Sequence, residues 1–254
     1  MHLLRSLFYL LLGTAPFVAQ AADEYKLSIN PAAFVEFNRQ DPLDNIRQWQ
    51  QHVRNWLRHD DGGLRLDGEL KPLPGRQVRF WDDEDGSLHQ QGWLLRERSS
   101  LDGGKSDWRL KTRQHDDKAM KDFDSEREYS RAGWDVSQSR DFRQRPTDRQ
   151  LQQLAITPSA HWQSWPDKGL IEENWQLGKV LQSDKEVKIT LEASLWRCPD
   201  GRPLAAELSY RAGKHEDEAA MMLFNLLKRE IPVPATLPST KTARLFSLGM
   251  GACN

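Results

Sequence analysis

The stretch RFWDDEDGSLHQQGWLLRERSSLDGGKSDWRLKTR, residues 79–113, predicts a β-hairpin with one strongly cationic face. Successive side chains of a strand point to opposite sides of the sheet. The two strands therefore gather cations on one face: Arg96, Arg98, Arg109, Lys111 and Arg113. Residues 99–106 between them are rich in turn formers, and Gly103 and Gly104 can adopt positive φ. The alternation and the turn together favour a hairpin.

The cationic face admits two interpretations. It is either the solvated outer surface of a half-buried hairpin, or the lining of a polar concavity that grips a phosphate or carboxylate group. In both cases the other face forms the core side, with Trp93, Leu95, Trp108 and Leu110. Closely spaced cations repel one another unless an anion lies among them, so the rest of the chain must decide.

The first 21 residues have the pattern of a secretory signal peptide. His2 and Arg5 precede an apolar run at residues 7–12, and Ala19-Gln20-Ala21 provides small residues two apart. The apolar run is too short to span a bilayer. We therefore expect cleavage after Ala21 and a periplasmic or secreted protein consisting of one domain, residues 22–254.

The composition of the chain argues against nucleic acid and membrane as partners. Charged residues make up 29% of the chain and the formal net charge is −1, so no global field recruits nucleic acid. After the signal peptide no segment is apolar enough to predict a membrane span. Cys198 and Cys253 could pair in an oxidising compartment, but Cys253 lies next to the chain end, so both the paired and the free state stay open.

The first part of the mature chain predicts one strand and one helix. Residues 23–29 alternate as a strand, with Glu24 and Lys26 on its polar face. Residues 42–58 predict a helix that Asp41 caps. Its apolar residues recur at helical spacing and form a buried stripe: Ile46, Trp49, Val53 and Leu57.

The segments around the hairpin are less regular. Residues 60–75 contain several Gly and Pro and predict a loop that leads into the hairpin. Residues 127–131 fit a further strand, and residues 140–153 fit a loop or the start of a helix. The pattern of residues 162–175 favours no single structure.

The C-terminal part alternates again. Residues 187–196 and 204–210 predict two strands joined by a turn, and their polar faces carry Glu192 and Glu207. Residues 216–230 predict an amphipathic helix, and residues 236–248 a last strand.

These strands predict an α+β fold, in which an antiparallel β-barrel with flanking helices encloses a tunnel. Each well-defined strand has one apolar and one polar face, and the polar faces separate by charge. If the barrel closes with its polar faces inward, the apolar side chains point outward and the two amphipathic helices can cover them: Trp93, Leu95, Trp108 and Ile189. A tunnel lined by Arg, Lys and Glu suits an anion together with a divalent cation.

Several short segments follow one another in a recognisable order: FWD at residues 80–82, LHQQGWLLRER at 88–98, RLKTR at 109–113, AELSYRAG at 206–213 and TKTAR at 240–244. This order resembles the CYTH domain of the triphosphate tunnel metalloenzymes. That group includes adenylate cyclases, thiamine triphosphatases and inorganic triphosphatases.

The resemblance implies a tunnel that binds a triphosphate- or polyphosphate-like anion and, with Mg²⁺ or Mn²⁺, hydrolyses it. The anion would be held by the cations Lys26, Arg96, Arg98, Lys111, Arg113 and Lys241. The metal would be held by the carboxylates Glu24, Glu192 and Glu207.

The chain departs from the family pattern on the acidic side. Ala22 stands at the first position of the family's Glu-x-Glu-x-Lys signature, Ser209 replaces a second closing-strand glutamate, and Trp196 stands where an aspartate is common. The metal site is therefore thinned. Two alternatives remain open: a non-catalytic exported binding or interaction protein with a degenerate metal site, and a structural protein whose polar faces are merely solvated.

Other chemistry has little support. The sequence has no Cys-x-x-Cys, His-Glu-x-x-His or Gly-x-Ser-x-Gly motif. Its ten Trp could suggest sugar binding. Trp49, Trp93 and Trp108 lie on predicted core faces, however, which favours packing.

Overall fold

A computed structural model describes most of the chain after residue 21: residues 22–34, 42–114, 120–159, 161–183, 185–231, 240–248 and 253. The expected signal peptide, residues 1–21, and the expected helix cap at Asp41 lie outside the described residues.

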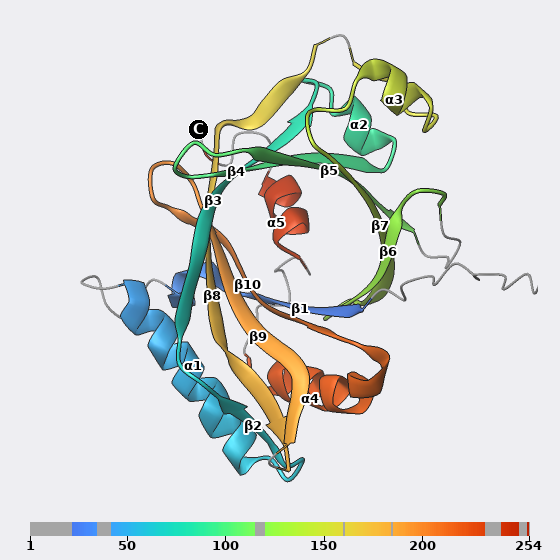
Figure 1. The fold of residues 1–254 in the computed structure, drawn as a ribbon. Coiled ribbons are helices and arrows are strands. Elements are labelled where there is room, and N and C mark those ends of the chain that lie inside the picture. Colours follow the sequence, from blue (N-terminus) through green and yellow to red (C-terminus); the bar gives the residue numbers. More distant parts are fainter. Residues whose placement is uncertain are drawn as a thin grey trace, which may run out of the picture.

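Within the described residues, nine strands close into a barrel (Figure 1). Their order around the ring is β8-β3-β4-β5-β7-β6-β1-β10-β9, and β9 pairs back with β8. The strands are β1 (Asp23–Ile29), β3 (Lys71–Asp82), β4 (Trp93–Ser100), β5 (Ser106–Gln114), β6 (Asp124–Ser130), β7 (Gly133–Phe142), β8 (Gln163–Gln182), β9 (Lys185–Arg197) and β10 (Pro203–Ala212). The short β2 (Leu64–Asp67) pairs with β8 beside the ring. The predicted α+β barrel with flanking helices is confirmed, and β1 and β6 form its one parallel pair among the described strands.

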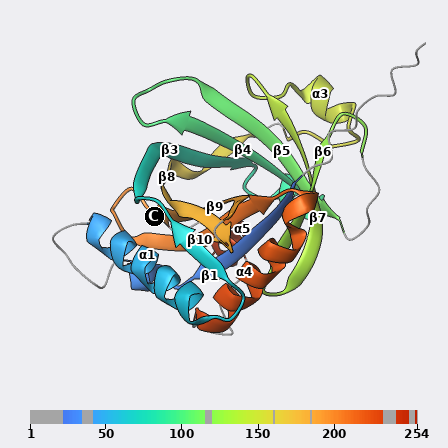
Figure 2. The same cartoon turned by 60° about the horizontal axis from the view of Figure 1, so that its bottom comes forward.

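Two long helices cover one side of the barrel, α1 (Pro42–His59) and α4 (Asp217–Glu230). Figure 2 shows them side by side, and α1 contacts β2 and β8 whereas α4 contacts β1. The predicted stripe of α1 is buried in the main apolar cluster with Ile189 and Leu223. Two 3₁₀ turns precede these helices, η1 (Pro31–Phe34) and η2 (Lys214–Glu216). No helix among the described residues is long and apolar enough to cross a membrane.

The outer face of the hairpin is covered differently from the prediction. Leu95 and Trp108 do not pack under the two long helices, although Ile189 does. They form a separate cluster with Leu88 of α2 (Ser87–Gln90) and Leu151 of α3 (Asp148–Gln152). The prediction was wrong here because these helices are too short to produce a helical period in the sequence.

The segment at residues 60–75 is not a loop throughout. It contains β2, where buried Leu64 and Leu66 alternate with exposed residues, and the first part of β3. The register between β3 and β8 shifts between Leu73 and Arg76, so Pro74 lies at an irregularity of the pairing. A proline in a strand is tolerated at such a position because no ladder hydrogen bond is required of it.

The structure also settles residues 162–175 and corrects the prediction for residues 236–248. The ambiguous residues 162–175 become the first half of β8, which pairs with both β3 and β9. The predicted last strand, residues 236–248, is wrong over its described part, which is the helix α5 (Lys241–Leu248). Thr240 caps this helix, since its Oγ1 accepts a hydrogen bond from the Ala243 amide at 3.1 Å.

The helix α5 lies inside the ring of strands in Figure 1. Its Leu245 is fully buried among inward-facing side chains of the barrel, including Val78, Phe80 and Trp196. An apolar cluster therefore occupies part of the interior, and the polar residues line the rest.

Candidate functional site: a charged tunnel

The barrel encloses a cavity of about 940 Å³. Every residue predicted for the site lines it: Glu24, Lys26, Arg96, Arg98, Lys111, Arg113, Glu192, Glu207 and Lys241. The cationic face of the hairpin thus lines a concavity and is not a solvated outer surface. The described lining holds nine Lys and Arg side chains against five Glu, so its surplus charge is positive.

Glu128 of β6 gathers three cations on one wall. Its carboxylate accepts hydrogen bonds from Lys26 at 2.9 Å, from Arg113 at 3.1 Å and from Lys111. Glu128 is 4% exposed. Burial raises the pKa of Glu128, but the three cations outweigh this effect and hold the pKa well below its usual value. The same burial lowers the pKa of Lys111 to about 8, with repulsion from Lys26 as the next cause.

Glu24 and Glu126 complete an acidic cluster beside Glu128. One carboxylate oxygen of each lies within 4.8 Å of the others. Lys26 Nζ lies between two of them, 2.6 Å from Glu24 and 2.9 Å from Glu128. Arg211 pairs with Glu126 at 2.8 Å.

Three converging carboxylates are a suitable oxygen donor set for a divalent cation. In the free chain, however, each of them is already paired with a Lys or Arg. The cluster therefore fits a metal only after something draws these cations away.

A second carboxylate joins the hairpin to the C-terminal helix. Glu172 of β8 is 2% exposed and accepts from Arg98 at 3.2 Å, from Lys241 at 3.3 Å and from the Trp196 indole at 2.8 Å. Burial raises the pKa of Glu172, but Lys241 and Arg98 hold it far below its usual value. Trp196, which stands where an aspartate is common in the family that the sequence resembles, thus acts here as a hydrogen-bond donor.

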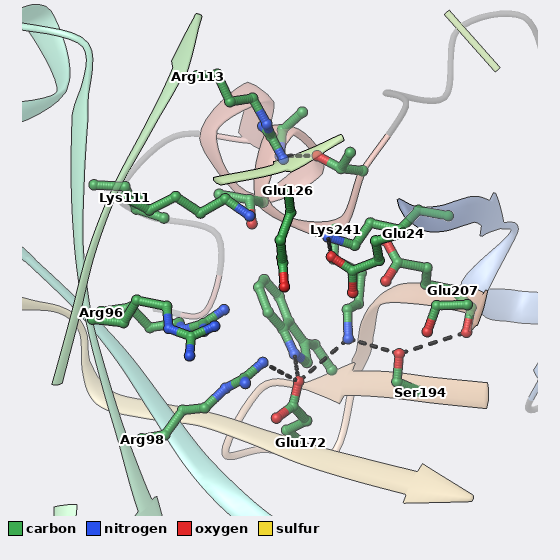
Figure 3. Close-up of a pocket in the computed structure, with 18 of the residues that line it drawn as sticks. Glu24, Arg96, Arg98, Lys111, Arg113, Glu126, Glu172, Ser194, Glu207 and Lys241 are labelled. Carbon is green, nitrogen blue, oxygen red and sulfur yellow. Dashed lines mark hydrogen bonds and ion pairs between the residues drawn. The ribbon is translucent and has the colours of Figure 1, made fainter. Parts of the chain in front are cut away.

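Among the described residues that line the cavity, Arg96 and Arg76 are the cations without a carboxylate partner, and Arg96 is the less exposed of the two. In the β4–β5 pairing it lies directly opposite Arg109, and Arg109 is held by Asp141 through two hydrogen bonds of 2.6 and 2.8 Å. Among the described residues no carboxylate pairs with Arg96, and its buried Nε has no acceptor. Burial, followed by repulsion from Arg98, lowers the pKa of Arg96 to about 9. Figure 3 shows its side chain pointing into the cavity.

The structure separates the three predicted metal ligands. Glu24 lies in the acidic cluster with Glu126 and Glu128, whereas Glu192 and Glu207 line the same cavity outside that cluster. The pKa of Glu192 is raised, mainly by burial.

Sequence reasoning missed the three best-positioned carboxylates: Glu126, Glu128 and Glu172. Glu128 lies within the strand predicted at residues 127–131, and Glu126 lies one residue before it at the same alternation, so a signal was present for both. Glu172 lies in the segment that could not be assigned.

The fold and the lining define a CYTH-like tunnel, a closed barrel whose interior carries opposed cations and carboxylates. No protein-family model matches the chain, and no curated protein matches its sequence.

Three solved structures are similar over most of the chain. A proposed adenylyl cyclase from Hippeastrum with a dominant triphosphatase activity is 13% identical, with a TM-score of 0.49 over 89% of this chain and 95% of that one. A proposed adenylate cyclase from Bacillus halodurans is 12% identical, with a TM-score of 0.43 over 86% and 96%. One from Vibrio parahaemolyticus is 12% identical, with a TM-score of 0.37 over 85% and 97%. At these values none of them supports a statement about the activity of this chain.

Proposed function

We propose that this chain is an exported protein that binds a triphosphate- or polyphosphate-type anion in its tunnel. The observation that carries the proposal is Arg96, a cation that points into the cavity and has no acid to balance it among the described residues. A partly desolvated guanidinium without an anion is costly, and an anionic ligand removes this cost.

The arrangement of the charges favours a phosphate chain over a single carboxylate. Arg96 and Arg98 lie on β4, whereas Lys111 and Arg113 lie on β5 and Lys26 on β1. One guanidinium group can bind two phosphate oxygens at once, whereas an ammonium group acts as a point charge. An extended polyanion can meet cations on several strands at once, which one carboxylate cannot do.

Because of the ion pairs in the free tunnel, binding of the anion should favour binding of a metal. When phosphate oxygens take over Lys26, Lys111 and Arg113, Glu128 and Glu24 lose the cations that now neutralise them. They can then bind Mg²⁺ or Mn²⁺ together with Glu126, and the preferred state holds anion and metal together. The metal-dependent hydrolysis of this anion is the second candidate function, favoured by the convergence of these three carboxylates. A bound metal would neutralise charge on the phosphate and orient a water molecule.

Calorimetry with sodium tripolyphosphate at low salt tests the proposal. We expect one site per chain, and Arg96→Ala should weaken binding by about 2 kcal/mol, the value of a hydrogen bond to a charged group. Arg229→Ala is the matched control, since Arg229 is exposed on α4 and pairs with Asp60 and Glu230 outside the cavity. Equal affinities of wild type and Arg96→Ala would exclude the tunnel as the binding site.

Phosphate release in the presence of Mn²⁺ tests the second candidate. Release that is abolished by Glu126→Gln would establish hydrolysis. Tight binding without release would show a binding protein.

A further inference from the structure

The C-terminal helix forms part of the tunnel from inside the barrel. Leu245 of α5 is fully buried in the apolar cluster of the inner strand faces. Phe246 packs against Phe80 and Trp165, with ring centroids 6.2 and 5.0 Å apart. The helix therefore rests on the interior of the barrel.

The same helix contributes to the charged lining. Lys241 Nζ donates to Ser194 Oγ at 2.7 Å and to Glu172 at 3.3 Å, and it lies 4.9 Å from the centroid of the Trp196 ring. Glu172 also accepts from Arg98 of the hairpin. The position of α5 consequently decides where the charge of Lys241 lies and how strongly Arg98 is neutralised.

One covalent bond attaches this end of the chain to the barrel. Cys253 forms a disulfide with Cys198, the residue that follows β9. Cys198 is buried in the apolar cluster that also contains Leu245, and Cys253 packs against that cluster. Trp196, whose indole donates a hydrogen bond to Glu172, precedes Cys198 by two residues.

We propose that the Cys198–Cys253 disulfide makes anion binding conditional on oxidation, because it keeps α5 and Lys241 in the tunnel. This inference rests on the proposed function for the identity of its ligand. Without the bond, α5 is held only by its non-covalent contacts and leaves its position in a fraction of the molecules. When α5 leaves its position, Lys241 is removed from the lining, and Arg98 remains as the cation that pairs with Glu172. A chain exported to an oxidising compartment thus acquires its full affinity there.

A dithiol reductant can operate the switch by thiol–disulfide exchange. A thiolate of the reductant attacks Sγ of Cys253, the less buried of the two cysteines, and Cys198 leaves as a thiolate. The second thiol of the reductant then displaces Cys253. The reductant becomes a disulfide, and both cysteines end as thiols after gaining two electrons and two protons in total.

The test compares three samples at low salt: the oxidised wild type, the wild type reduced by dithiothreitol, and the double variant Cys198→Ser with Cys253→Ser. Calorimetry measures tripolyphosphate affinity, and hydrogen exchange measures protection of residues 241–248. Reduction and the double variant should each lower the affinity about tenfold, as expected if α5 is in place in about one tenth of the molecules. Exchange should accelerate in α5 but not in β4 or β5. Dithiothreitol should have no effect on the double variant.

Three results would overturn the inference. The first is an unchanged affinity in the reduced protein, whether or not α5 exchanges faster. The second is accelerated exchange throughout the barrel, which would show that the bond maintains global stability. The third is a response of the double variant to dithiothreitol. If the oxidised wild type binds no tripolyphosphate, the proposed function fails, whereas α5 exchange still reports whether the disulfide positions the helix.

Discussion

Arg96 and Arg109 lie directly opposite each other on β4 and β5, and only Arg109 is balanced by a carboxylate, that of Asp141. Like charges in this position destabilise a sheet. The imbalance therefore distinguishes Arg96 from the cavity-lining cations that pair with carboxylates, such as Lys26, Arg98 and Lys111. This difference allows the tunnel residues to be tested one at a time.

Thermal unfolding without an anion should separate two kinds of cation. Arg96→Ala should melt no lower than wild type, because it removes a repelling charge and breaks no ion pair. Lys111→Ala should lower the free energy of unfolding by roughly 2 kcal/mol, because buried Glu128 loses one of its partners. This corresponds to a melting temperature lower by about 4–8 °C. Differential scanning calorimetry at low salt measures both. A larger loss in Arg96→Ala than in Lys111→Ala would contradict the assignment of partners.

Variants of the tunnel cations and of a surface arginine should respond differently to tripolyphosphate. The anion should raise the melting temperature of wild type, with stabilisation growing as RT ln(1 + [L]/Kd). Arg98→Ala and Lys111→Ala should lose most of this increase, since both side chains line the cavity. The control Arg229→Ala should keep it. An increase of equal size in all four proteins would place the anion outside the tunnel.

Metal binding should depend on the anion. Mn²⁺ should bind weakly to the free protein, because Lys26 already bridges Glu24 and Glu128. Calorimetry with Mn²⁺ in the presence of tripolyphosphate should show that the protein with tripolyphosphate binds Mn²⁺ more tightly than tripolyphosphate alone does. Glu126→Gln should reduce this difference in affinity. Tight Mn²⁺ binding to the protein alone would mean that a different set of ligands holds the metal.

Anion affinity should fall as the pH rises through about 8. Burial lowers the pKa of Lys111 to about 8, so Lys111 carries the charge that attracts the anion below this pH and loses it above. The control is Lys111→Arg, because a guanidinium keeps its charge to a higher pH than an ammonium group at the same position. Titrations between pH 7 and 8.5, below the pKa of about 9 for Arg96, should show a steeper loss for wild type than for Lys111→Arg. Parallel curves would indicate that Lys111 does not titrate in this range.

Export has its own test. If residues 1–21 are a signal peptide, the exported protein should begin at or near Ala22. N-terminal sequencing or intact mass of the exported fraction measures this directly, and an intact Met1 in that fraction would contradict the prediction.

The sequence by itself determined the faces of the strands. Alternation placed Arg96 and Arg98, and likewise Lys111 and Arg113, on shared faces, because a strand repeats every two residues wherever it lies in the fold. The stripe of α1 was readable for the same reason, since a helix that buries one side must repeat its apolar residues. The barrel followed from these faces together with the family resemblance.

Tertiary structure decided which charges meet. Glu128 and Lys26 are 102 residues apart in the chain, and Glu172 and Lys241 are 69 apart; no local pattern records such pairs. The same holds for α5, which lies inside the barrel because Leu245 finds an apolar surface there, although its short sequence fits a strand equally well. The sequence thus specified what each strand offers to the interior. Closure of the ring decided which cations are neutralised, and it left Arg96 without a carboxylate partner among the described residues.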